Sequence, residues 1–334
     1  MIHKKDINPM NILVIVGRDV HSWRIISGFQ NCGNNVSVAN KYEDIDKTLY
    51  DLVLLDPSTN FDPTLKLRYK LLMFYDCEDD AKHFDPDVAY YTMKDRVTAY
   101  AKMNWVEEDK RDDIKNIGFP LPVYSSLRQI TSYQSRFNHY TPFLVCSPTF
   151  LGHYNTHKEV DTDLHTRYLS KIDDEILYSQ RVQWFLSLRE NGVDYKGGIV
   201  FGREKTNLCL SWQKKYFGNV EQFAHNPITR EEYIKMLFQF NIALCPTGHE
   251  RISWRIFDAM ATGSIIFRTD FCGVKMMIMP KESIEVKDDD DISFVLSSYS
   301  NCYEELSKAA KDNQKLLNIS NYDIMKIFKE QYDD

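Results

Sequence analysis

Short runs of almost purely apolar residues recur along the first hundred residues of the chain, and stretches with helical periodicity separate them. The runs occupy positions 11–16, 36–39, 52–55, 71–75 and 88–91. A strand with few polar positions must be covered on both faces, as happens when a parallel sheet lies between two layers of helices. Positions 21–31 and 42–49 have the apolar spacing of helices and fill two of the connections. This part of the chain is therefore predicted to form an α/β domain.

The same alternation starts again after a polar, proline-containing segment at 119–142. Strands are expected at 143–147, 198–201, 242–245 and 264–267, and helices at 174–191, after a capping box formed by Thr229 and Glu232, at 303–317 and at 323–332. We therefore predict two Rossmann-like halves that face each other across a cleft. The predicted domains are 1–130 and 131–316, followed by a last helix at 317–334 that packs back on the first domain.

One stretch, 242–267, reads as a strand, a polar loop, a helix and a second strand. Gly263 ends the helix, where a residue with positive φ is often needed. The start of a helix offers free backbone N–H groups and the positive end of the helix dipole, and both favour an anion such as a phosphate. The candidate ligand-binding residues around this helix start are His249, Glu250, Arg251 and Ser253 in the loop and Arg255 in the first helical turn.

The loops after the other predicted strands hold further candidates, because ligands of open α/β sheets bind at the carboxyl ends of the strands. In the first half, Asp19 and His21 follow the first strand and Asp76 follows the fourth. The first strand leads into a single glycine, Gly17, rather than the G-x-G-x-x-G pattern of dinucleotide sites, so no dinucleotide is expected there. In the second half the corresponding loops contain Thr149, Arg203 and Lys205.

Charge and cysteine content limit the environments and partners of the chain. The net charge is −7, which argues against broad, non-specific binding to nucleic acid but leaves room for a local basic site. The seven cysteines form no C-x-x-C pair, so we expect a reducing, cytoplasmic location without disulfides or a zinc site. No apolar run approaches the roughly 20 residues of a membrane span, and the first nine residues lack the apolar core of a signal peptide.

The spacing of two acidic residues resembles a signature of one enzyme class. Glu250 and Asp258 are separated by seven residues, and the sequence from Asp258 to Ile266 is similar to the E-A-M-A-x-G-x-P-V pattern of retaining GT-B glycosyltransferases. Ser264 stands where that pattern has proline. The resemblance implies a GT-B fold and a nucleotide-sugar donor bound by the second half. It assigns the ribose hydroxyls to Asp258, and the donor sugar or diphosphate to Glu250.

A second resemblance is to the phage DNA β-glucosyltransferases, which are also GT-B enzymes. It rests on Arg255 followed three residues later by Asp258, on the run from Gly202 to Lys205, and on Asp76 directly after a strand of the first half. It implies that Asp76 is the catalytic base. Fucosyltransferases and exostosin-like enzymes share a similar Cys-Pro, Phe-Asp-Ala and Gly stretch. The resemblance is specific over about 198–270 and only architectural over 1–130.

The chemistry implied by the resemblance is the departure of a diphosphate from a sugar. Basic side chains and helix dipoles stabilise that leaving group in GT-B enzymes, usually without a metal ion or cofactor. The candidates for this role are Arg203, Lys205, Arg251 and Arg255. Two D-x-D triplets, 85–87 and 161–163, have the form that binds manganese in another glycosyltransferase fold. Neither follows a suitable strand, so no metal site is expected.

The predicted function is a glycosyltransferase that moves a sugar from a nucleotide donor, with UDP or GDP as the nucleotide, to a hydroxyl of a glycan or glycoprotein. An inverting reaction needs a base, for which Asp76 is the first candidate and Asp19 or His21 the second. The spacing of Glu250 and Asp258 favours retention instead. A DNA acceptor, an inactive module that binds a sugar nucleotide or glycan, and a nucleotide-sugar epimerase of the same build stay open.

Overall fold

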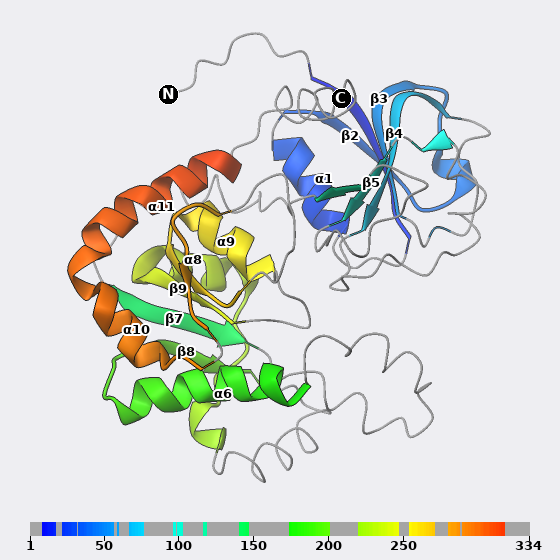
Figure 1. The fold of residues 1–334 in the computed structure, drawn as a ribbon. Coiled ribbons are helices and arrows are strands. Elements are labelled where there is room, and N and C mark those ends of the chain that lie inside the picture. The colour runs from blue at the N-terminus through cyan, green and yellow to red at the C-terminus, as the bar shows by residue number, and fades with distance from the viewer. Residues whose placement is uncertain are drawn as a thin grey trace, which may run out of the picture. The chain divides into compact units, whose positions relative to one another are not determined.

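The computed structural model describes most of the regular elements of the chain. The described residues are 9–17, 22–31, 33–56, 59, 67–76, 96–97, 99–102, 116–118, 140–146, 174–200, 220–246, 254–270, 280–287 and 289–317. By their contacts they divide into two compact units (Figure 1), unit 1 within Met1–Arg128 and from Lys315 on, and unit 2 within Gln129–Cys272 and Pro280–Gln314. The predicted boundary at 130 and the predicted helix at 323–332 lie outside the described residues.

Unit 1 is built on a six-stranded sheet with the order β2-β1-β3-β4-β5-β6, and its paired strands are parallel. The strands are β1 (Asn11–Ile15), β2 (Asn35–Ala39), β3 (Leu49–Leu55), β4 (Arg68–Asp76), β5 (Ala99–Lys102) and β6 (Asn116–Gly118). Helix α1 (Ser22–Asn31) connects β1 to β2 and packs against both. The α/β prediction and the first four strands are confirmed, and β5 and β6 are additions.

The predicted helix at 42–49 is wrong. Only a 3₁₀ turn, η1 (Tyr42–Asp44), forms there, and β3 begins at Leu49. Asp46 explains the difference, because its carboxylate accepts the Thr48 backbone N–H at 2.8 Å and the Tyr50 hydroxyl at 2.7 Å. An aspartate that bonds the backbone two residues ahead favours a turn over a helix. The predicted strand at 88–91 lies outside the described residues.

Unit 2 is built on a five-stranded sheet with the order β11-β10-β9-β7-β8, and its paired strands are parallel. The strands are β7 (Thr141–Cys146), β8 (Lys196–Ile199), β9 (Asn241–Cys245), β10 (Ile265–Arg268) and β11 (Ile284–Glu285). The four predicted strands agree with β7, β8, β9 and β10 within two residues, and β11 is an addition. Strand β8 comes earlier than expected because Gly197 and Gly198 pair with β7.

Four of the five described helices in this part of the chain pack as two pairs. The five helices are α6 (Asp174–Glu190), α8 (Arg230–Phe240), α9 (Trp254–Thr262), α10 (Ile292–Tyr299) and α11 (Tyr303–Leu317). Helix α6 packs against α10, and α8 packs against α9 (Figure 1). The capping box is confirmed, since Thr229 accepts the Glu232 N–H and the Glu232 carboxylate accepts the Thr229 N–H. No helix among the described residues is long and apolar enough to cross a membrane.

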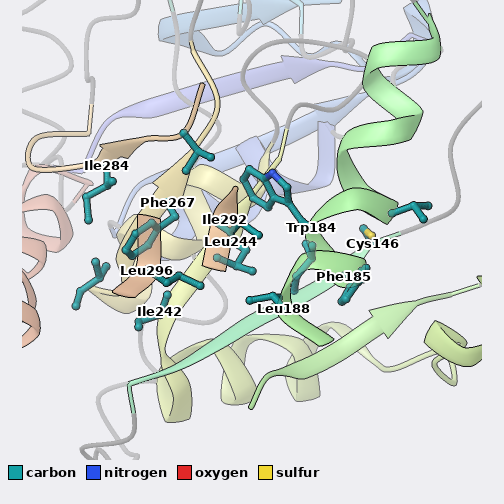
Figure 2. Close-up of a cluster of buried hydrophobic side chains, with 14 of the residues drawn as sticks. Cys146, Trp184, Phe185, Leu188, Ile242, Leu244, Phe267, Ile284, Ile292 and Leu296 are labelled. Carbon is teal, nitrogen blue, oxygen red and sulfur yellow. The ribbon is translucent and has the colours of Figure 1, made fainter. Parts of the chain in front are cut away.

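The core of unit 2 on the α6 and α10 side is an aromatic and aliphatic cluster (Figure 2). Trp184, Phe185 and Leu188 of α6 and Ile292 and Leu296 of α10 contribute to it. Strand residues that alternate along the sheet, Leu144, Ile242, Leu244, Ile265 and Phe267, form its other half. This face of the sheet is therefore held mainly by apolar packing.

The acidic run before α10 also caps that helix. Asp289, Asp290 and Asp291 are exposed, and Asp291 is the N-cap of α10 and accepts the backbone N–H groups of Ser293 and Phe294. It also accepts the Ser187 hydroxyl at 2.7 Å. These hydrogen bonds, with that of Ser187 first, hold the pKa of Asp291 below its ordinary value, against the opposing effect of burial. The cap therefore ties α10 to α6.

The first prediction concerns the close approach of β8 to β7. Gly197 has φ of +110°, and a Cβ atom there would lie 1.9 Å from the Leu144 carbonyl oxygen. Gly197→Ala is expected to lower the free energy of unfolding by about 3 kcal/mol, from left-handed strain and backbone overlap together. Gly192→Ala is the matched control, because φ is +65° there and a Cβ would meet nothing within 4 Å. It should cost about 1 kcal/mol. Equal losses in chemical denaturation would contradict the argument.

Candidate functional site

The carboxyl edge of the unit 2 sheet brings together side chains from three helices, α6, α8 and α9, and three strands, β7, β9 and β10. Strand β7 ends at Cys146, β9 at Cys245 and β10 at Arg268. Helix α8 ends where β9 starts, and helix α9 follows the end of β9. Both helices therefore begin at the carboxyl edge of the sheet. Because ligands of open α/β sheets bind at this edge, we take these residues as the candidate site.

Arg255 lies in the first turn of α9 and is almost completely buried, with 6% of its surface exposed. Burial alone would lower the pKa of Arg255, but neighbouring groups, Tyr233 first among them, hold it above its ordinary value. Arg255 therefore keeps its charge. The positive charge of Arg255 acts to lower the pKa values of Cys146 and Cys245, the last residues of β7 and β9.

Asp258, one turn further along α9, is fully buried and forms an ion pair with Arg230, the first residue of α8. The pair is bidentate, with Nη1 of Arg230 donating to Oδ2 and Nη2 donating to Oδ1. Burial alone would lower the pKa of Arg230. The Asp258 carboxylate has the opposite and larger effect, so the pKa of Arg230 is held above its ordinary value. A buried carboxylate is tolerated only with such a partner.

Aromatic packing supports the same pair. The Arg230 guanidinium lies over the Tyr233 ring at 5.7 Å from its centroid, a distance at which a cation and an aromatic face attract. The Tyr233 ring in turn contacts the Phe143 ring of β7 at 5.6 Å. Burial also raises the pKa of Tyr233 far above its ordinary value, so its hydroxyl stays protonated.

The start of β10 and the end of α9 are joined by hydroxyl groups beneath the ion pair. Thr262 donates to the Asp258 backbone carbonyl and to that of Ala259, both at 3.0 Å. Its hydroxyl is also 2.7 Å from that of Ser264, which donates to the Leu237 carbonyl of α8. Gly263 has φ of +64°, as expected for the residue that ends the helix. Ser264, where the glycosyltransferase pattern has proline, is thus part of this hydrogen-bonded chain.

Two further arginines lie at the edge. Arg181 of α6 is buried, and its charge acts on Cys146. Arg268 at the end of β10 donates to the Ser283 hydroxyl at 2.9 Å and to the Thr269 carbonyl, and pairs with Glu285 at 3.3 Å. Arg181 and Arg268 join Arg230 and Arg255, so positive charge exceeds negative charge among the described residues of the edge.

The two cysteines at the strand ends are not nucleophiles. Burial raises the pKa of Cys245 to about 12, although nearby Arg255 acts in the opposite direction. Burial likewise raises the pKa of Cys146, against the effects of Arg181 and Arg255. Because only a thiolate is strongly nucleophilic, both residues act as small apolar groups at neutral pH.

Unit 1 has a smaller polar network at the carboxyl edge of its sheet. Asp56, which follows β3, is buried and accepts the Gly17 backbone N–H at 3.0 Å. The Tyr75 hydroxyl near the end of β4 lies 2.7 Å from the Ser22 hydroxyl at the start of α1. The network therefore joins the ends of β1, β3 and β4 to the start of α1.

Only some of the site residues predicted from the sequence lie among the residues that the structure describes. Arg255 and Asp258 lie close together in α9, as expected. The backbone of Asp76 ends β4, where it pairs with Lys102 of β5, while its side chain is outside the described set. The remaining candidates also lie outside it, namely Asp19, His21, Thr149, Arg203, Lys205, His249, Glu250, Arg251 and Ser253.

Sequence reasoning missed Arg230, Arg181 and Tyr233. A signal for Arg230 was present, because it follows the capping-box threonine as the first residue of a helix. A cation at that end of a helix is disfavoured by the dipole, so its position calls for an acidic partner elsewhere in the fold. Arg181 and Tyr233 have no comparable local signal.

Solved structures similar to the whole chain identify the fold. An alpha-glucosyltransferase in complex with UDP and a 13-mer DNA containing an HMU base matches with a TM-score of 0.54 and 12% identity, over 98% of this chain and 99% of that one. A glycosyltransferase from Rickettsia africae ESF-5 matches with a TM-score of 0.51 and 10% identity, over 97% and 99% of the two chains. The chain has the GT-B fold.

The alpha-glucosyltransferase also matches as a complex with UDP-glucose and DNA containing an abasic site, with a TM-score of 0.50 and 12% identity, over 98% of this chain and 99% of that chain. No protein-family model and no curated protein sequence matches. At these identities the structural similarity establishes the GT-B fold, and the reaction has to be argued from the residues of the site. Among the described residues, no group of three or more His, Cys, Asp and Glu side chains has the arrangement of a metal site.

The second prediction concerns the buried ion pair of this GT-B unit. Asp258→Asn leaves Arg230 without its charge partner, and is expected to lower the free energy of unfolding by about 2–4 kcal/mol. Asp51→Asn is the matched control, since Asp51 pairs at 2.6 Å with Lys70, whose side chain is 61% exposed. The control should cost less than about 1 kcal/mol. Urea unfolding curves measure the free energy of unfolding of both variants. Equal losses would show that the burial of Asp258 does not determine how much its ion pair stabilises the protein.

Proposed function

We propose that this protein is a glycosyltransferase that transfers a sugar from a nucleotide-sugar donor to a hydroxyl group. The observation that supports the proposal most strongly is the buried, charged Arg255 at the start of α9. A guanidinium that is costly to bury lies at the edge where ligands of such sheets bind, which suits a diphosphate. The similar alpha-glucosyltransferase binds UDP and, in another complex, UDP-glucose, which supports a nucleotide donor.

Arg255 would stabilise the negative charge that develops on the diphosphate as the sugar leaves. Fixed cations in a site that excludes water stabilise such charge more strongly than water does, because they need no reorganisation. Arg181 adds positive charge near the end of β7. Arg203, Lys205 and Arg251 remain candidates for the same role from their positions in the sequence.

The acceptor hydroxyl would be deprotonated by a base from unit 1. Asp76 ends β4, and its neighbour Tyr75 lies within hydrogen-bond distance of Ser22, the residue after His21. The start of α1 and the end of β4 thus approach each other at the carboxyl edge of the sheet. We assign the base to Asp76 in an inverting reaction, with no metal ion or cofactor in the proposed mechanism. Retention, with Glu250 and Asp258 at the donor, is the second candidate.

A glycan or glycoprotein is our proposed acceptor, since the net charge of −7 disfavours extensive contact with DNA phosphates. A DNA base is the second candidate, because the similar alpha-glucosyltransferase was solved with DNA. A cytoplasmic location is proposed from the seven cysteines without a C-x-x-C pair. Cys146, Cys245 and Cys302 are free thiols, which is consistent with a reducing compartment.

The third prediction tests the donor. UDP, GDP, ADP, CDP and dTDP are screened by thermal shift against the full chain, with the matching nucleosides as controls. One nucleoside diphosphate should stabilise the protein by about 2.7 kcal/mol at 100 times its dissociation constant. The nucleoside alone should produce a much smaller shift because it lacks the diphosphate. If no diphosphate raises the melting temperature, the nucleotide-donor proposal is wrong.

The fourth prediction tests the base. Asp76→Asn should bind the donor nucleotide as the wild type does, and should transfer sugar at least about 100-fold more slowly, the usual contribution of a general base. Transfer is measured with the matching nucleotide sugar against glycans, glycopeptides and DNA containing HMU. The anomeric configuration of the product distinguishes inversion from retention. Full transfer by the variant would remove Asp76 from the mechanism.

A further inference from the structure

Arg230 is the member of the Arg230–Asp258 pair that a ligand can reach. The Asp258 side chain has no exposed surface, whereas 28% of the Arg230 side chain is exposed. Both carboxylate oxygens accept hydrogen bonds from Arg230. A ligand that approaches from solvent therefore meets the guanidinium first, and the carboxylate lies behind it.

The guanidinium is held in one orientation by two independent contacts. The bidentate ion pair fixes its plane, because a planar fork matches a carboxylate in only one arrangement. The Tyr233 ring supports it from one side, and Phe143 of β7 supports that ring. An orientation fixed before binding reduces the entropy lost when a ligand is bound.

The position of Arg230 in α8 favours the ion pair with Asp258 and does not favour the stability of the helix. It is the first residue of the helix, where the dipole disfavours a cation. The next two residues, Glu231 and Glu232, follow the opposite and usual preference, and Glu232 completes the capping box. Helix stability thus gives no reason for an arginine here, whereas the buried Asp258 carboxylate does.

Charge separates the role of Arg230 from that of Arg255. Arg230 and Asp258 together have no net charge, so the pair contributes little attraction for a dianionic diphosphate. We propose that Arg230 donates hydrogen bonds to an uncharged acceptor on the nucleoside part of the donor, a ribose hydroxyl or a base carbonyl, and that Asp258 is a positioning residue that acts through Arg230. This inference rests on the proposed function, and it differs from the expectation that Asp258 itself binds the ribose.

The experiment compares two ligands on the same variants. The ligands are inorganic pyrophosphate and the nucleoside diphosphate that stabilises the wild type most, and their affinities are measured by calorimetry. Arg230→Lys keeps a positive charge beside Asp258 but loses the fork, and should weaken nucleoside diphosphate binding about tenfold, the loss of one charged hydrogen bond. Pyrophosphate affinity should change less than twofold. Arg255→Lys should weaken both ligands.

Two further variants separate a positioning role from a loss of structure. Asp258→Asn should cause the same selective loss as Arg230→Lys, and the double variant should lose no more than either single one, since the two residues act as a unit. Arg189→Lys is the control, because Arg189 is exposed in the last turn of α6. It should leave both affinities unchanged.

The 2′-deoxy form of the same diphosphate identifies the acceptor. If Arg230 donates to the 2′-hydroxyl, Arg230→Lys causes no additional loss with the deoxy ligand. If the tenfold loss persists, the acceptor is the base or the 3′-hydroxyl, and Arg230 still contacts the nucleoside.

The outcomes that overturn the inference differ from those that overturn the proposed function. Unchanged affinity of Arg230→Lys for the nucleoside diphosphate, or equal weakening of that ligand and pyrophosphate, shows that Arg230 does not recognise the nucleoside, while donor binding by the wild type stands. Binding of neither ligand by the wild type overturns both proposals.

Discussion

The ion pair between Arg230 and Asp258 is the interaction on which the arrangement of the second unit's polar edge depends. Asp258 lies in a helix whose residues from Arg255 to Thr262 are all buried. A carboxylate in such a helix would be strongly destabilising without a cation, so the start of α8 must lie against α9. Once it does, Tyr233, one turn into α8, is placed between Arg230 and Phe143 of β7. The pair therefore fixes how both helices meet the ends of the strands.

The parallel sheets account for the location of both polar networks. In each unit the strands end at one edge, and the following helices begin there, so backbone N–H groups and side chains from distant parts of the sequence gather together. In unit 1, Asp56 accepts a hydrogen bond from Gly17, and the Tyr75 and Ser22 hydroxyls share another. In unit 2 this edge brings together arginines from α6, α8, α9 and β10. The face of the unit 2 sheet toward α6 and α10 is covered by the aromatic and aliphatic core (Figure 2).

The parts of the fold that depend on local patterns were predictable from the sequence. Apolar runs identify β1, β3, β4, β7 and β9, and the Thr229–Glu232 capping box identifies the start of α8. The predicted helix at 42–49 failed because one side chain, Asp46, bonds its own backbone and ends the regular pattern. The short strands β5 and β6 lack a distinctive apolar run. The site was predictable where a motif spans a single helix, as Arg255 and Asp258 do. Arg230 was not, since its partner lies 28 positions away and no local pattern records the contact.

The missed Arg230 shows how the partner of a buried acidic residue can be found from the sequence. An acidic residue within an otherwise apolar helix needs a cation, and the cation must come from an element that packs against that helix. A basic residue directly after a capping threonine is out of place for its own helix, because the dipole opposes it. When the two anomalies occur in consecutive helices of one α/β unit, each explains the other, as Asp258 and Arg230 do here. The pair that results is neutral and rigid, which suits the recognition of an uncharged group better than the neutralisation of a phosphate.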